Sequence, residues 1–189
     1  MKLIKFFLLI LLSFNISVKA NSNDKIQSLL KEGKKLIFIR HAYAPGGGDP
    51  ENFDIMNCDT QRNLDKEGIV QSMNIGKILL RNNLEPYKVI SSEWCRCKET
   101  AEYAFKDYET RRFLNSFFSK KFAHNKSKQI KELKDYIQKW DGKKNLVFVT
   151  HYVVILEILN IPITEGEIIV TDKELNILVR KRTYKKKLY

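Results

Sequence analysis

Two histidines and two arginines follow apolar segments of the sequence, and side chains of these types can transfer a phosphoryl group. Arg40 and His41 come after the first such segment, Arg96 after the second and His151 after the third. Two guanidinium groups at one pocket bind the oxygens of an oxyanion such as phosphate. A neutral imidazole beside them can attack phosphorus, because the charge of the arginines lowers its pKa. These residues predict a phosphoryl-transfer site with His41 as the nucleophile.

Alternating strands and helices must position these residues. Apolar segments predict buried parallel strands at residues 35–39, 87–90 and 145–150, and a terminal strand pair at 167–171 and 175–180. Helices are predicted at residues 25–31, 65–82, 93–105, 126–140 and 152–159. The expected fold class is α/β, with three α/β/α layers and a mainly parallel sheet. Ligands of such sheets bind beyond the carboxyl ends of the strands, so these strand ends predict one common pocket.

Four segments in this order resemble motifs of the histidine phosphatase superfamily, the phosphoglycerate mutase-like group. They are Ile39-Arg40-His41-Ala42, then Leu64-Asp65 with Gly68 and Gln71-Ser72, then Ser91-Ser92 with Arg96 and Thr100-Ala101, and finally Val149-Thr150-His151. The resemblance implies a phosphoglycerate mutase-like fold in which His41 becomes phosphorylated. It also implies that Arg40 and Arg96 bind the phosphoryl oxygens and that His151 completes the pocket, with no metal and no cofactor.

The residues leave two roles open, those of the proton donor and of Arg62. Many members of the superfamily carry a glutamate after the second arginine, and others an aspartate after the second histidine. Here Tyr152 follows His151, and residues 111–118 contain no carboxylate, so Glu109 is the nearest candidate for the general acid. Arg62 precedes the helix predicted at 65–82, where it could contact substrate or stabilise a loop.

The first twenty residues are typical of a secretory signal. Lys2 and Lys5 precede an apolar run at residues 6–14, and Val18-Lys19-Ala20 has the small-x-small pattern of a cleavage site. The run is much shorter than the roughly 20 apolar residues that span a bilayer. The sequence predicts a signal peptide at 1–20, one histidine phosphatase domain at 21–189 and a periplasmic or secreted location. No integral membrane segment is expected after cleavage.

Export would expose three cysteines to an oxidising compartment, in which a disulfide can persist. Cys95 and Cys97 are too close in sequence to bridge each other comfortably, so Cys58 is expected to pair with one of them. Cys58–Cys97 is the preferred pair, because Cys97 lies further into the predicted helix. Three free thiols are the alternative.

Charge and composition limit the partners. The formal net charge of +12 favours anionic substrates, and export argues against a nucleic-acid role for the basic C-terminal tail. The run Gly46-Gly47-Gly48 lacks the lysine of a nucleotide-binding loop and is expected to form a flap at the pocket mouth. Two arginines would repel a metal ion. The expected partner is a small-molecule or glycolipid phosphate, and the oligomeric state is left open.

Three functions are compatible with these residues. The first is an exported phosphomonoesterase that acts on a phosphorylated sugar of the cell envelope, because one exported branch of the superfamily resembles a lipopolysaccharide-core heptose phosphatase. The second is a phosphohistidine phosphatase acting on proteins, which needs no strong proton donor. The third is a binding protein that holds a phosphorylated ligand without turnover.

Overall fold

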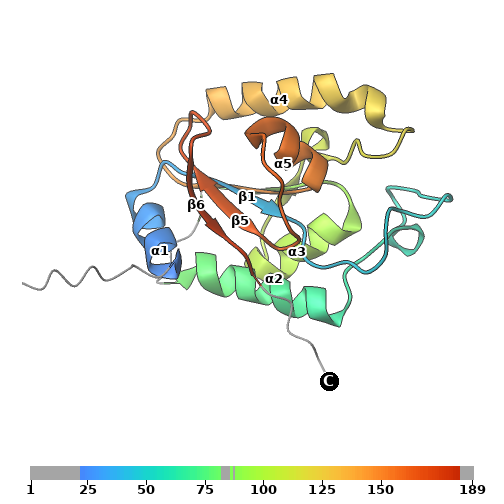
Figure 1. Cartoon of the computed structure of the whole chain (residues 1–189), viewed down its shortest axis with the longest axis horizontal. Helices are drawn as coiled ribbons and strands as arrows, with labels where there is room; N and C mark the ends of the chain where they lie inside the picture. The colour runs from blue at the N-terminus through green and yellow to red at the C-terminus, as the bar shows by residue number, and fades with distance from the viewer. Residues whose placement is uncertain (1–21, 82–85, 87, 184–189) are drawn as a thin grey trace, which may run out of the picture.

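A six-stranded sheet forms the centre of the molecule in a computed structural model that describes residues 22–81, 86 and 88–183 (Figure 1). The predicted signal peptide and the last residues of the basic tail lie outside the described residues. The strands are β1 (Leu36–Arg40), β2 (Lys88–Ser91), β3 (Glu109–Thr110), β4 (Leu146–Thr150), β5 (Ile168–Thr171) and β6 (Ile177–Lys181). Their order is β3-β2-β4-β1-β5-β6.

The sheet is mainly parallel, as the sequence predicted. Strands β3, β2, β4 and β1 pair in parallel, whereas β5 pairs antiparallel with both β1 and β6. The terminal strands therefore form the expected edge hairpin. The two-residue strand β3 was not predicted, because so short a segment carries no periodicity.

Alternating side chains of the strands face two separate cores, which gives the three α/β/α layers. Leu36 and Phe38 of β1 point to one core, which α4 (Lys126–Lys139) and α5 (Tyr152–Leu159) cover. Ile37 and Ile39 point to the other core, which is covered by α1 (Ser22–Glu32), α2 (Lys66–Leu79) and α3 (Cys95–Phe105). Figure 1 shows α4 and α5 above the sheet and α2 and α3 below it. Burial of every second residue on each face explains the continuous apolar strands.

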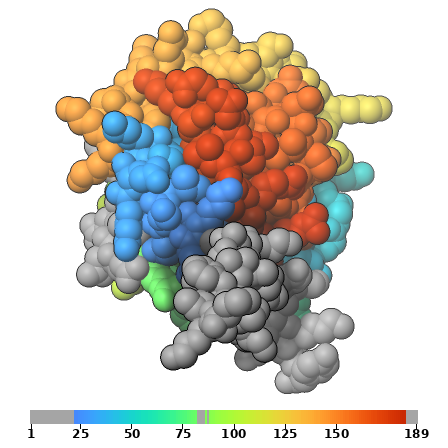
Figure 2. All heavy atoms as spheres, turned by 60° about the vertical axis from the view of Figure 1, so that its left-hand side comes forward, coloured from blue at the N-terminus to red at the C-terminus, as the bar shows by residue number. Residues whose placement is uncertain are grey.

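The two ends of the described chain lie on one face of the molecule. Figure 2 shows α1 in blue beside the red residues of the C-terminal hairpin. The side chain of Lys181 on β6 donates a hydrogen bond of 3.0 Å to Ser22 at the start of α1. Within the described residues, no helix is both long enough and apolar enough to cross a membrane.

The disulfide joins Cys58 to Cys95, so the preferred pairing of Cys58 with Cys97 is wrong. The two Cα atoms are 5.7 Å apart, and Cys97 is a buried free thiol. Cys95 is the first residue of α3 and faces the loop that carries Cys58. Two residues further along, the helix has turned by about 200°, which directs Cys97 into the core beneath the sheet.

The disulfide closes a loop across 37 positions of the sequence and should stabilise the fold substantially. We expect Cys58→Ser with Cys95→Ser to lower the free energy of unfolding by about 3–4 kcal/mol, mainly because the unfolded chain gains conformational freedom. Urea unfolding without reductant measures this difference. Reduced wild type should match the double variant. A double variant within about 1 kcal/mol of the oxidised wild type would contradict the prediction.

Candidate active site

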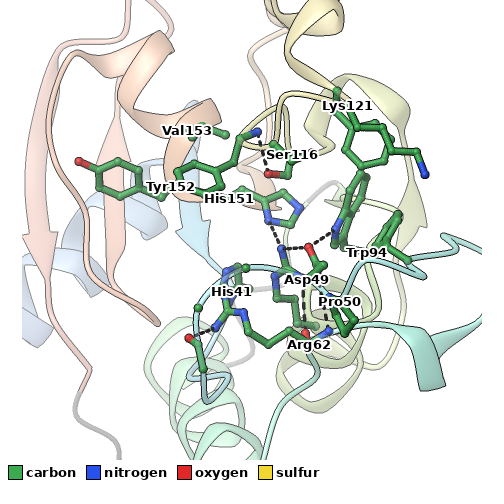
Figure 3. Close-up of a pocket in the computed structure, with 18 of the residues that line it drawn as sticks. His41, Asp49, Pro50, Arg62, Trp94, Ser116, Lys121, His151, Tyr152 and Val153 are labelled. Atoms are coloured by element: carbon green, nitrogen blue, oxygen red, sulfur yellow. Dashed lines mark hydrogen bonds and ion pairs between the residues drawn. The ribbon is translucent and has the colours of Figure 1, made fainter.

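The carboxyl ends of three strands bring the predicted site residues into one cavity of about 720 Å³ (Figure 3). Arg40 ends β1 and His41 follows it, Arg96 lies in the first turn of α3 after β2, and His151 follows β4. The backbone N–H of His41 donates a hydrogen bond of 2.9 Å to the carbonyl of Thr150, which holds the two strand ends together. The two imidazole ring centres are 5.5 Å apart.

His41 is held as a neutral ring. Its Nδ1 lies 2.8 Å from the carbonyl oxygen of Ala42, and since a carbonyl only accepts, Nδ1 carries the proton and Nε2 keeps its lone pair. The side chain is only 2 % exposed. Burial, followed by the charges of Arg96 and Arg40, lowers the pKa of His41 well below 6.5. The sequence predicted this direction from charge, whereas burial is the larger cause.

His151 is also neutral and is fixed by two neighbours. Its Nδ1 is 3.5 Å from Nη2 of Arg96, and a guanidinium cannot accept a hydrogen bond. The proton therefore lies on Nε2, which is 2.9 Å from the hydroxyl of Ser92. Burial and then the charge of Arg96 lower the pKa of His151 well below 6.5. The hydroxyl of Ser92 donates in turn to the side chain of Asn115 at 3.1 Å.

The lowered pKa of these two histidines predicts that the fold loses stability in mild acid. The unfolded chain binds protons on both rings as the pH falls below about 6.5, whereas the folded chain keeps them neutral until a lower pH. The free energy of unfolding should fall in that window by up to about 1.4 kcal/mol per pH unit for each histidine. Urea unfolding between pH 7 and pH 5 measures the slope.

His41→Asn provides the comparison for this pH dependence, because it removes one titrating ring from the folded and the unfolded state alike. The slope of stability against pH should become shallower in this variant. His124→Asn is the matched control, because His124 is exposed and lies outside the cavity. Equal slopes in wild type and His41→Asn would contradict the prediction.

The arginines of the cavity are paired with two carboxylates that the sequence did not single out. Arg96 is 4 % exposed, and its Nη1 and Nη2 donate to Asp49 at 2.6 and 3.2 Å. Arg40 and Arg62 both pair with Glu165, at 3.4 and 3.5 Å. Asp49 directly follows the glycine run after the nucleophile, which was a usable signal. Glu165 precedes β5 in a loop without any motif.

Arg62 stabilises a loop and also lines the cavity. Its guanidinium donates to the carbonyl oxygen of Ala44 and contacts Glu165 in the cavity wall. The backbone N–H of Arg62 donates to Asp49 at 3.2 Å. Arg62 therefore contacts both the loop after β1 and the carboxylates that pair with the cavity arginines.

Three buried donor nitrogens in the cavity have no hydrogen-bond partner among the described residues. They are the Nε atoms of Arg40, Arg62 and Arg96. A buried donor without a partner is costly and is rare in folded proteins. Each of these donors belongs to an arginine that lines the cavity, and a group of guanidinium side chains is typical of an oxyanion site.

The structure does not bring Glu109 to the cavity, which corrects its assignment as the general acid. Glu109 lies on the edge strand β3, where it pairs with Lys88 at 3.3 Å and with Arg111 at 3.0 Å. It is absent from the cavity lining, which receives Ser116 and Phe118 from the segment that follows β3. A position on the outermost strand directs its carboxylate towards neighbouring basic side chains.

Aromatic and basic side chains form the mouth of the cavity. Phe53, Trp94 and Phe122 pack against one another with ring centres 5.0 to 5.6 Å apart. Lys120 and Lys121 also line the cavity, as do Gly46, Gly47 and Gly48 of the loop after β1. Within the described residues, no three His, Cys, Asp or Glu side chains are grouped so as to hold a metal ion.

Comparison with known proteins shows the fold. No protein-family model and no curated protein sequence matches this chain. The protein histidine phosphatase SixA complexed with tungstate is a structural neighbour, with 15% identity, a TM-score of 0.59 and coverage of 77% of this chain and 95% of that chain. The putative phosphohistidine phosphatase SixA from Agrobacterium tumefaciens has 14% identity, a TM-score of 0.57 and coverage of 80% and 99%. Phosphoglycerate mutase from Thermus thermophilus has 14% identity, a TM-score of 0.55 and coverage of 79% and 99%. This chain therefore has a phosphoglycerate mutase-like fold.

Proposed function

We propose that this chain is a member of the histidine phosphatase superfamily that hydrolyses a phosphomonoester through a phosphohistidine on His41. The observation that carries the proposal is the buried neutral ring of His41, whose Nδ1 proton is fixed by Ala42. Its Nε2 lone pair is free to attack, and Arg40 and Arg96 lie in the same cavity. The structural likeness to two proteins described as SixA phosphatases agrees with this chemistry.

The reaction has two steps. Phosphoryl oxygens bind the guanidinium groups of the cavity arginines, and Nε2 of His41 attacks phosphorus as the bond to the leaving oxygen breaks. The positive charges of Arg40 and Arg96 stabilise the charge on the transferring group. Water then attacks phosphorus, the phosphorus–nitrogen bond breaks, and the electron pair returns to Nε2.

We further propose that the substrate is a phosphorylated sugar, free or on a glycolipid, outside the cytoplasm. A cavity of about 720 Å³ has room for more than a phosphate. The apolar face of a sugar ring can pack on the aromatic group of Phe53, Trp94 and Phe122, and lysines at the mouth attract anionic substrates. The signal-like first twenty residues and the disulfide support export.

A phosphohistidine phosphatase acting on proteins is the second candidate function. It is favoured by the two structural neighbours described as SixA, one of them a protein histidine phosphatase. The relative rates on a phosphohistidine peptide and on sugar phosphates separate the two candidates. A higher kcat/KM on the peptide would favour the second.

Trapping of a phosphorylated intermediate tests the proposed function. The oxidised protein is mixed with phosphorylated sugars, nucleotides and activated esters, quenched, and assayed for protein-bound phosphate that is labile in acid and stable in base. Wild type should carry such phosphate on His41 and release inorganic phosphate. Tight binding of tungstate without turnover of any substrate would instead favour a non-catalytic binding protein.

A further inference from the structure

Asp49 is a carboxylate that four donors hold inside the cavity. It lies on the loop after β1, and its side chain is 18% exposed. Nη1 and Nη2 of Arg96 donate to its two oxygens at 2.6 and 3.2 Å. The indole of Trp94 donates at 3.1 Å, and the backbone N–H of Arg62 at 3.2 Å. Figure 3 shows Asp49 beside Trp94, with the ring of His151 close by.

Asp49 and a phosphoryl group could share Arg96 without competing for one edge of its guanidinium. Asp49 takes the end of the group, whereas the buried Nε has no hydrogen-bond partner in the described part of the chain. On the second donor edge, which Nε and Nη2 form, the N–H of Nη2 already faces Nδ1 of His151, so Nε is the donor without a partner there. Nη2 also lies 3.5 Å from Nδ1 of His151, so this edge adjoins the histidine pair. A phosphoryl oxygen bound at this edge of Arg96 would be separated from Asp49 by only one guanidinium nitrogen.

We propose that Asp49 is the proton donor for the leaving group, a role that Glu109 cannot fill from the edge of the sheet. The inference rests on the proposed phosphatase function. His41 attacks from the strand ends, so an in-line leaving oxygen departs on the opposite side, towards the mouth. The loop of Asp49 lines that mouth. Gly46 and Gly48 precede Asp49 in this loop with φ of +89° and +83°, backbone conformations that favour glycine.

Substrate binding would convert Asp49 from a base into an acid. Burial raises the pKa of Asp49, but hydrogen bonds and charge from Arg96 outweigh it and hold the pKa below its ordinary value. A bound phosphoryl group adds negative charge beside the carboxylate and draws on the same guanidinium, and both effects raise the pKa. A phosphomonoester monoanion brings the proton that Asp49 takes up, since its second pKa is near 6.

The proton then balances over the two steps. As the bond from phosphorus to Nε2 of His41 forms, the bond to the leaving oxygen breaks and Asp49 gives its proton to that oxygen. In the second step, the carboxylate of Asp49 accepts a proton from the attacking water while the phosphorus–nitrogen bond breaks. Inorganic phosphate then takes this proton from Asp49 and leaves as its monoanion, so both side chains return to their starting states.

Asp49→Asn tests this role through its dependence on the leaving group. An alkyl phosphate needs a proton on its leaving oxygen, whereas p-nitrophenolate leaves without one. We expect the variant to lower kcat/KM for an alkyl phosphate by about 10²–10⁴-fold and for p-nitrophenyl phosphate by less than about tenfold. Asp59→Asn is the matched control, because Asp59 is an exposed carboxylate further along the same loop that does not line the cavity. It should behave as wild type on both substrates.

Three results would overturn the role of Asp49. Equal losses on both substrates would mean that Asp49 only positions Arg96. A lower KM for both substrates at unchanged kcat would mean that it only competes with phosphate. A leaving-group-dependent loss in Glu165→Gln but not in Asp49→Asn would assign the proton to Glu165. Phosphoenzyme formation from p-nitrophenyl phosphate shows that the Asn variant is folded. A wild type that forms no phosphohistidine would instead refute the proposed function, and that experiment involves no Asp49 variant.

Discussion

Replacing His41 with alanine is expected to lower turnover of a phosphomonoester by about 10⁴-fold or more and to abolish the phosphoenzyme. The variant loses the nitrogen that accepts the phosphoryl group, but it keeps the guanidinium groups that bind its oxygens. Tungstate should therefore still bind within about tenfold of the wild-type affinity. The measurements are kcat/KM on the best substrate, acid-labile phosphate after quenching, and tungstate binding by calorimetry.

His124→Ala is the control for this variant. The chain has three histidines, and His124 is exposed and outside the cavity. Its replacement should leave both turnover and phosphoenzyme unchanged. Turnover by His41→Ala within about tenfold of wild type, or acid-labile phosphate that persists in it, would refute the proposed mechanism. Parallel loss of tungstate binding and of thermal stability would mean that the substitution had damaged the fold instead.

The layers and the site position could be predicted because strand ends are visible in the sequence. Leu36 to Ile39 and Leu146 to Val149 are apolar on both faces, and such runs belong to strands that are covered by helices on each side. Each run stops where a charged or polar residue begins. The pairing of β1 with β4 then places Arg40 opposite Thr150 in the register, directly before the two histidines.

The disulfide and the cavity carboxylates could not be predicted, because they depend on how loops fold over the strand ends. Whether Cys95 or Cys97 reaches Cys58 is decided by where α3 begins, and a shift of two residues reverses its face. Asp49 comes from the loop after β1 and Glu165 from the loop before β5, and only the pairing of β1 with β5 in the folded chain brings them to the same cavity. The glycine run marks the loop of Asp49 but not its arginine partner, and no local pattern marks Glu165.

Burial would allow the proposed site to act with so few groups. A histidine beside arginines on an open surface would be only partly deprotonated, because solvent screens their charge. At 2 % and 3 % exposure, His41 and His151 lose the hydration of their charged forms, so the neutral rings are favoured first by burial. The same burial strengthens the attraction between guanidinium groups and a phosphoryl oxygen. One feature of the fold thus prepares both the nucleophile and the oxyanion site.

Arg96→Ala is expected to lower kcat/KM by about 10³–10⁵-fold, because this guanidinium joins the phosphoryl site, His151 and Asp49. The variant also leaves Asp49 without its ion-pair partner, so tungstate affinity should fall together with activity. Arg96→Lys keeps one positive charge beside Asp49 but lacks the second donor edge. Arg96→Lys should be as stable as wild type, but its kcat/KM should remain about 10²–10³-fold below that of wild type.

Arg112→Ala is the matched control for the arginine series, because this side chain is 87% exposed and pairs only loosely with Glu93 at 3.8 Å. Its activity and tungstate affinity should equal those of wild type. Thermal unfolding separates the structural role of Arg96 from its role in catalysis. If the lysine variant is as stable as wild type but a poor catalyst, the loss of activity is due to the missing guanidinium donors. A lysine variant within about threefold of wild type in kcat/KM would show that a positive charge alone suffices for catalysis. The proposal that Arg96 binds Asp49 and the phosphoryl group through two donor edges would then be wrong.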